Sequence, residues 1–253
     1  MSNKKLSAMS HIGLSIQDLG DCDTAILTGD PHRVAFLAKC LDKNAKHLKN
    51  SREYHSYRVK VNNKSILVIS TGIGGPSTSI CIEELAMLGI ERFIRVGTTG
   101  AIQHKIKLGD LIISTASVRL DGASFHYAPS RYPAVSSFPL TMELYNSATS
   151  LNFTTHLGIT ASTDTFYPGQ ERYDNYTGYV RNKYRGSMEE WKKLNVLNYE
   201  MESATLFTVC SVLGLEAACI CGVLVQRAVT EQLAGNTESI MTNIMDVVRK
   251  TLK

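Results

Sequence analysis

Residues 92–100, Arg-Phe-Ile-Arg-Val-Gly-Thr-Thr-Gly, begin as an apolar run and stop at glycine and hydroxyl residues. This pattern is typical of a buried strand that delivers polar groups to one edge of a sheet. Ligands of open α/β sheets bind outside the carboxyl ends of the strands. Because Arg95, Thr98 and Thr99 stand at this end, the segment predicts a site for an anionic or polyhydroxylated ligand. Taken alone, the nine residues are equally compatible with a strand and an ordinary glycine-rich turn.

Short apolar runs alternate with helix-like patterns along the whole chain. Strands are predicted at 25–27, 57–61, 66–69, 93–96, 111–115, 157–161 and 219–225, and helices at 34–41, 80–88, 142–151, 206–210 and 240–252. No linker, repeat or low-complexity run divides the 253 residues, so we expect a single domain over 1–253. The alternation predicts an α/β fold of three α/β/α layers around a central mixed, mainly parallel sheet.

Composition excludes several classes of function. The net charge is only +4 and the Lys and Arg residues are scattered, which argues against nucleic-acid binding. The six cysteines form no Cys-x-x-Cys pair, so neither a zinc site nor a disulfide framework is indicated. The longest nearly apolar run, 217–225, is about half of a membrane span. No apolar stretch follows Lys4 and Lys5, and we therefore expect a cytoplasmic protein without a signal peptide.

A second concentration of functional side chains follows the strand at 157–161. Residues 164–173, Asp-Thr-Phe-Tyr-Pro-Gly-Gln-Glu-Arg-Tyr, hold three aromatic rings, one amide and one guanidinium. These groups suit a flat heteroaromatic ligand that is stacked and hydrogen-bonded at its edge. An aromatic-rich surface loop is the alternative.

Two carboxylates stand two residues apart in the segment 196–204. If this segment is extended, Glu200 and Glu202 lie on the same side of it. Close carboxylates resist joint ionisation unless a cationic or hydroxyl group lies between them. A glycosidase pair is a rival interpretation, although such pairs usually come from different segments and face each other across a bond.

Three turns have residues that bear on helix capping or anion binding. Asp30 and Pro31 are suited to begin a helix whose first turn carries Arg33. The glycine-rich loop 70–79 matches neither common phosphate-binding motif, so close backbone packing is its expected role. Ser187, with Glu190 three residues on, has the pattern of a capping box.

Taken together, the segments 11–14, 29–33, 70–79, 95–101, 117–123, 164–174 and 199–204 resemble the nucleoside phosphorylase family, and within it the bacterial uridine phosphorylases. The resemblance runs over nearly the whole chain. It implies a pentosyltransferase that transfers ribose from uridine, and in our expectation deoxyuridine, to inorganic phosphate in pyrimidine nucleoside salvage and catabolism. The products would be uracil and ribose 1-phosphate, and no organic cofactor would be needed.

The resemblance also implies a role for each matching position. Phosphate would be held by Gly29, Arg33, Arg95 and Thr98, with Arg52 from a neighbouring subunit. Ribose would be held by Thr98, Glu200, Met201 and Glu202, with His11 from the neighbour, and the base by Phe166, Gln170, Arg172, Leu224, Val225 and Arg227. The residues expected to carry catalysis are Arg95, Gln170, Arg172 and Glu202. Family members are homohexamers, trimers of dimers, with a potassium ion between subunits at positions matching Glu53, Ile73 and Ser77.

Particular positions also indicate which base is expected and where this chain differs from the family pattern. Purine-cleaving relatives carry an aspartate after the last core strand, where this chain has Gln226 and Arg227, so uracil is expected and thymine is second. Ser51 and Gln226 replace the usual histidine and asparagine, and 228–237 lacks the usual proline. A nucleosidase, a nucleoside-binding protein without turnover and a dinucleotide-binding protein remain as alternatives; the last lacks a G-x-G-x-x-G motif.

Overall fold

The computed structural model describes residues 8–229, 231–233 and 236–253. Its strands are β1 Thr24–Thr28, β2 Lys46–Ser51, β3 Tyr54–Val61, β4 Lys64–Ser70, β5 Arg92–Ala101, β6 Leu111–Leu120, β7 Ala134–Val135, β8 Thr155–Thr163, β9 Asn198–Glu200, β10 Glu216–Gln226 and β11 Gln232–Leu233. Its α-helices are α1 Ile16–Leu19, α2 Val34–Leu41, α3 Gly75–Met87, α4 Phe138–Ser150, α5 Ser187–Lys193, α6 Ser203–Leu213 and α7 Thr237–Thr251. Short 3-10 turns lie at Pro31–Arg33, Ala123–His126 and Asn182–Tyr184.

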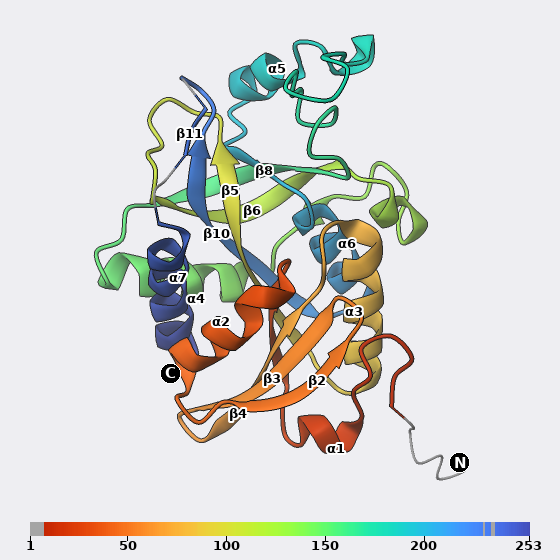
Figure 1. Cartoon of the computed structure of the whole chain (residues 1–253), viewed down its shortest axis with the longest axis vertical. Coiled ribbons are helices and arrows are strands. Elements are labelled where there is room, and N and C mark those ends of the chain that lie inside the picture. The colour runs from red at the N-terminus through yellow and green to blue at the C-terminus, as the bar shows by residue number, and fades with distance from the viewer. Residues whose placement is uncertain (1–7, 230, 234–235) are drawn as a thin grey trace.

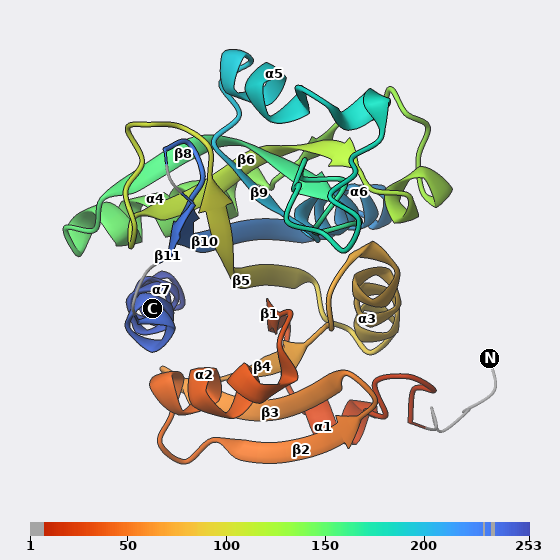
Figure 2. The ribbon, with the colours of Figure 1, turned by 45° about the horizontal axis from the view of Figure 1, so that its top comes forward.

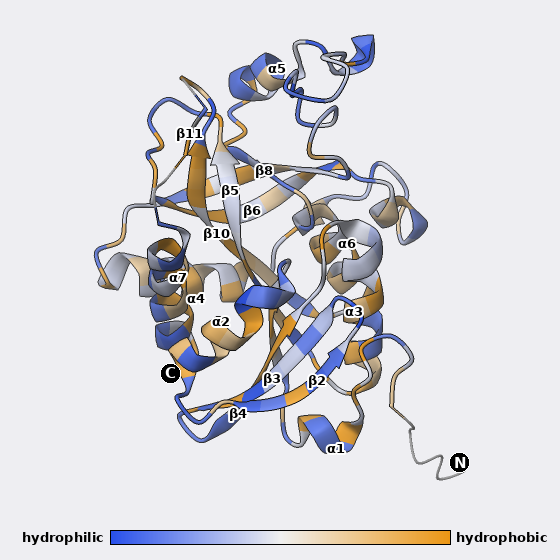
Figure 3. Ribbon diagram, in the orientation of Figure 1, coloured by the Kyte–Doolittle hydropathy of each residue, from blue (hydrophilic) through white to orange (hydrophobic). Residues whose placement is uncertain are grey.

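The predicted three-layer α/β/α fold with a mixed sheet is confirmed. The expectation that this sheet is mainly parallel is wrong, because six of the eleven pairings between the described strands are antiparallel. Figures 1 and 2 show α2, α4 and α7 on one side of the sheet and α3 and α6 on the other. Two apolar clusters fill the spaces between these layers. One joins the sheet to α2, α4 and α7, and the other joins it to α3 and α6. In Figure 3, β10 is mainly hydrophobic, whereas β2 is mainly hydrophilic.

The strand pairings close a ring within the larger sheet. The order is β11-β10-β6-β8-β9-β5-β1-β4-β3-β2, with an additional pairing of β10 with β5. The pairs β10–β6, β6–β8, β8–β9, β9–β5 and β5–β10 therefore complete a circuit of five strands. Strands β1 to β4 extend from the β5 side of this ring (Figure 2).

On one side, strand β5 pairs with β1 at its start and with β9 at its end. The gap between these two partners is where the candidate site lies. The first residues of β5 pair with β1 as far as Arg95, and Gly100 and Ala101 pair with β9. Residues 96–99 have neither partner on that side, although β10 continues beside them on the other. The expectation that the strand stops before Gly97 is therefore wrong: the polar residues lie within β5, because β10 supplies hydrogen bonds along its whole length.

One further expectation is wrong, and one strand was not predicted. Ser187 does not cap α5; its N-cap is Gly186 with a positive φ, and the Glu171 carboxylate accepts hydrogen bonds from the Gly186 and Met188 N–H groups at 2.5 and 2.8 Å. The segment 46–51, for which no structure was predicted, is the edge strand β2. Its residues are nearly all polar and mostly exposed, so the sequence shows no apolar alternation from which a strand could be predicted.

Candidate active site

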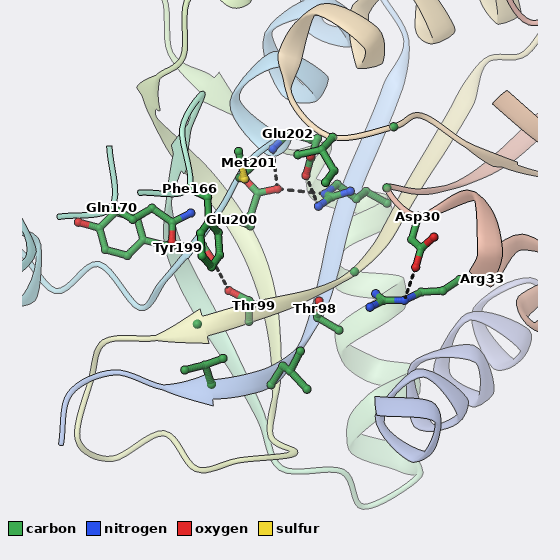
Figure 4. A pocket seen from close by; sticks show the side chains of 18 of the residues that line it. Asp30, Arg33, Thr98, Thr99, Phe166, Gln170, Tyr199, Glu200, Met201 and Glu202 are labelled. Atoms are coloured by element: carbon green, nitrogen blue, oxygen red, sulfur yellow. Dashed lines mark hydrogen bonds and ion pairs between the residues drawn. The ribbon is translucent and has the colours of Figure 1, made fainter. Parts of the chain in front are cut away.

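A pocket of about 550 Å³ lies where β5 lacks a neighbour. Its walls come from β5, β9, the ends of β1 and β10, the start of the glycine-rich loop and the 164–173 loop. In Figure 4, Asp30 and Arg33 lie on one side of the pocket, Phe166 and Gln170 on the other, and Thr98, Glu200, Met201 and Glu202 between them. The described residues that line it are Gly29, Asp30, Pro31, Arg33, Glu53, Gly72, Ile73, Arg95, Gly97, Thr98, Thr99, Gly100, Phe166, Gln170, Arg172, Tyr199, Glu200, Met201, Glu202, Leu224, Val225 and Leu233.

Arg95 lies between Glu200 and Glu202, the two carboxylates that were predicted to share one side of their segment. Its Nε donates to Glu200 Oε2 at 3.0 Å, and its Nη2 forms an ion pair with Glu202 Oε2 (Figure 4). All three side chains are buried. The requirement for a cation between Glu200 and Glu202 is thus met by Arg95, from β5.

Glu200 is held by more donors than Glu202. It accepts from the N–H groups of Glu202 and Ser203 at 2.9 Å and from the Ser203 hydroxyl at 2.5 Å. Glu202 accepts from the Gly74 N–H at 2.6 Å, which ties it to the glycine-rich loop. Both carboxylates thereby fix the position of Arg95, and the Glu202 carboxylate also borders the middle of the pocket.

Burial and charge oppose each other at this triad. Burial alone would lower the pKa of Arg95, but Glu202 and Glu200 outweigh it and raise that pKa. Burial, opposed by Arg95, raises the pKa of Glu202. Arg95 Nη1 is buried and has no partner among the described residues. A buried guanidinium with an unused N–H group is suited to donate to an anionic oxygen.

The other arginine at this end is more exposed. Arg33 follows Asp30, which caps the short 3-10 turn by accepting from the His32 N–H at 2.9 Å. Arg33 Nε lies 3.5 Å from Asp30 Oδ2, and 28% of its side chain is exposed. The remaining donors of Arg33 are therefore available to a ligand.

The opposite end of the pocket is aromatic and basic. The Arg172 guanidinium lies over the Phe166 ring, 4.3 Å from its centroid. Arg227 lies behind this wall, where its Nη2 donates to the Gln170 carbonyl at 2.9 Å. Burial, and then the nearby Arg227 charge, lower the pKa of Arg172. Leu224 and Val225 add apolar surface, so this end is suited to a flat ring with carbonyl acceptors.

Comparison with known proteins identifies the family. Residues 23–253 match the family model described as "Phosphorylase superfamily". The uridine phosphorylases of Salmonella typhimurium and Escherichia coli are each 53% identical over 234 residues, which is 92% of this chain and 91% of those proteins. The uridine phosphorylase of Thermococcus kodakarensis is 46% identical over 206 residues, 81% of this chain and 74% of that protein. The chain belongs to the phosphorylase superfamily.

Four predicted site residues of this phosphorylase-superfamily chain lie outside the lining of the pocket. Arg52 is exposed in the β2–β3 turn, and His11 Nδ1 lies 2.6 Å from Glu84 Oε1. Arg227 stands behind the wall, and Ser77 lies in the first turn of α3. For His11 and Arg52, which were expected to serve a neighbouring subunit, contribution to a second site stays a prediction.

The phosphorylase-superfamily site also contains residues that sequence reasoning missed. Leu233 of β11 lines the pocket, and Glu231 contacts both Arg172 and Arg227. Gln226 faces away from the pocket and donates to the Gln103 carbonyl at 3.2 Å, bracing another loop. Only part of the altered segment 228–237 is described, since 230, 234 and 235 lie outside the described residues.

None of the described helices has both the length and the apolar character of a membrane span. Within the same part of the chain, no cluster of three or more His, Cys, Asp or Glu side chains could hold a metal ion.

Proposed function

We propose that this protein is a uridine phosphorylase, a pentosyltransferase that reversibly converts uridine and phosphate into uracil and ribose 1-phosphate. The observation that carries the proposal is the arrangement in one pocket of an arginine–carboxylate triad between an anion-binding end and an aromatic, donor-rich end. The 53% identity to proteins named uridine phosphorylase supports the choice of uridine as the substrate.

Phosphate would bind at the end formed by Gly29, Arg33, Arg95 and Thr98. Arg95 is fixed by two carboxylates and keeps one donor without a partner, while Arg33 has donors free of Asp30. Forked guanidinium contacts to phosphate oxygens are each worth about 1.5–3 kcal/mol when charge-assisted. These contacts would aim a phosphate oxygen at the anomeric carbon of the sugar.

Ribose would bind in the middle of the pocket, beside Met201 and the carboxylate of Glu202. Glu202 is anchored by Arg95 and by the Gly74 N–H, so it is already oriented before a hydroxyl donates to it. Glu200 lines the pocket too, but Arg95, two backbone N–H groups and the Ser203 hydroxyl already donate to its carboxylate. We therefore assign Glu200 the task of holding Arg95.

The reaction breaks the bond between the anomeric carbon and the base nitrogen and forms a bond from that carbon to a phosphate oxygen. The departing base takes the bonding electron pair and becomes an anion, which later gains a proton from water. Donors of Gln170 and Arg172 at the carbonyl oxygens of uracil would stabilise this developing charge. Phe166 would stack on the ring, and no covalent enzyme intermediate is needed.

The proposal extends to the oligomeric state, the cellular role and a potassium ion. We propose a homohexamer in which Arg52 and His11 complete a neighbouring subunit's site, and a cytoplasmic role in pyrimidine nucleoside salvage and catabolism. A potassium ion is chemically compatible with Glu53, the Ile73 carbonyl and Ser77. Glu53 and Ser77 approach Gly72 so closely that a Cβ there would lie 3.0 Å from Glu53 Cγ and 3.3 Å from Ser77 Oγ. Hard oxygen donors of this kind suit such a cation.

The test is ultraviolet-monitored cleavage of uridine and, separately, of inosine by the purified protein, each with and without phosphate. We expect uridine to be lost only when phosphate is present. Cleavage without phosphate would make the protein a nucleosidase, cleavage of inosine would overturn the assigned base preference, and no reaction with either would favour a nucleoside-binding protein.

A further inference from the structure

Glu231 joins the two arginines at the base end of the pocket. This residue lies just before β11, with a positive φ of 47°. Its carboxylate accepts from Arg227 Nε at 2.9 Å and from Arg172 Nη1 at 3.2 Å to one oxygen and 3.3 Å to the other. One half-exposed carboxylate thus contacts two guanidinium groups that are almost fully buried.

Arg172 and Arg227 have few other hydrogen-bond acceptors among the described residues. Arg172 Nε and Arg227 Nη1 are both buried and have no partner in the described part of the chain. Asp174 lies 3.9 Å from Arg172 Nη1, but 61% of its side chain is exposed, so water screens this contact. Glu231 is therefore the principal negative charge that offsets the repulsion between the two buried cations.

Glu231 also connects the arginines to a wall of the pocket. Two residues further on, Leu233 lines the pocket and pairs with Val225 of β10 in the antiparallel β10–β11 hairpin. The contacts of Glu231 thus hold the 231–233 segment against the side of the pocket where Phe166, Gln170 and Arg172 lie.

We propose that Glu231 is a positioning residue for nucleobase recognition: it orients Arg172 toward the base and holds the 231–233 segment against the pocket. This inference rests on the proposed function, because it assigns the Phe166 and Arg172 end to the base. Glu231 touches neither the sugar nor the phosphate end. Its loss therefore affects recognition of the base and leaves recognition of phosphate unchanged.

The experiment compares Glu231→Gln with the unchanged protein and with Glu238→Gln. Gln keeps the size and an acceptor oxygen of Glu231 but removes the charge. Glu238, in the first turn of α7, is exposed and provides the matched loss of one carboxylate. The readouts are the separate KM values for uridine and phosphate, the dissociation constant of uracil by calorimetry, and the melting temperature.

For Glu231→Gln we expect the KM for uridine and the dissociation constant of uracil to rise about tenfold, with the KM for phosphate within about twofold of the original. Glu231→Asp, which restores the charge, should recover most of the uracil affinity. Glu238→Gln should match the unchanged protein in every readout.

Two results would overturn the inference. One is a Glu231→Gln protein whose uracil affinity and uridine KM stay within about twofold of the original. The other is an equal rise in both KM values together with a lower melting temperature, which a purely structural role would produce. If the proposed function itself were wrong, the unchanged protein would not cleave uridine in the presence of phosphate, which distinguishes this case from both results above.

Discussion

The two ends of the pocket are built from different kinds of structure. Arg95, Glu200 and Glu202 come from β5, β9 and the start of α6, and buried donors and acceptors hold each of them. Phe166, Arg172 and Glu231 come from connecting segments; Phe166 is 45% exposed, and the Glu231 side chain is 48% exposed. The centre that would align phosphate and ribose is therefore fixed by the core, whereas the base end depends on loops that can be altered at small cost in stability.

The largest expected effect comes from Arg95→Ala. This change removes the cation between two buried carboxylates, so we expect turnover to fall by at least about 10³-fold and the free energy of unfolding to fall by about 3–5 kcal/mol. Steady-state kinetics and chemical denaturation measure the two effects. The control is Arg92→Ala on the same strand, whose ion pairs with Glu143 and Glu216 are partly exposed and worth less than about 1 kcal/mol each. Near-normal turnover of the Arg95 variant would contradict the phosphate assignment.

A smaller effect is expected from Phe166→Ala at the other end. Loss of the ring removes the proposed stacking surface for the base and the contact with Arg172, so the KM for uridine should rise about tenfold. The free energy of unfolding should change by less than about 1 kcal/mol because the ring is exposed. Tyr176→Ala is the matched control, since this aromatic residue of a nearby loop is fully exposed and does not line the site. If Phe166→Ala unfolds as readily as Arg95→Ala, the contrast between the two ends is wrong.

Glu84 provides a carboxylate outside the pocket against which the buried triad can be compared. Burial alone would raise its pKa, but the N–H groups of Ile12 and His11 and the His11 ring outweigh burial and lower that pKa. A carboxyl group with a lowered folded-state pKa stabilises the fold above its ordinary pKa of 4.5 and loses this effect as pH falls through the folded-state value.

We therefore expect Glu84→Gln to lower the free energy of unfolding by about 1 kcal/mol at pH 7, with a difference that shrinks below pH 4.5. Denaturation curves of both proteins at several pH values test this. Glu202, whose pKa is raised by burial, has the opposite dependence: its contribution to stability decreases as pH rises above the ordinary value of 4.5. If the free energies of unfolding of Glu84→Gln and the unchanged protein differed by the same amount at every pH, Glu84 would act through packing alone.

Sequence reasoning was most successful where the functional residues lie close together in the sequence. The period-two spacing of Glu200 and Glu202 predicted that they share a side, and Arg95 lies between them. The 164–173 cluster likewise supplies Phe166, Gln170 and Arg172 to the pocket.

It failed where a group from elsewhere in the chain replaced the local one. Glu171 takes the capping role predicted for Ser187, and Glu231 reaches two arginines from a segment with no regular pattern. The closing of the ring by the β5–β10 pair could not be predicted either, because strand order depends on contacts distant in sequence.

The cap that Glu171 supplies has a consequence for how base preference can diverge. Glu171 stands between Gln170 and Arg172, and its carboxylate binds the first N–H groups of α5, a helix on the outside of the molecule (Figure 1). A substitution that shifts the start of α5 therefore moves the backbone that carries the two side chains to which we assign recognition of the base. Under the proposed function, a change on this outer helix would alter the recognition of the base while every residue assigned to contact the substrate stays the same.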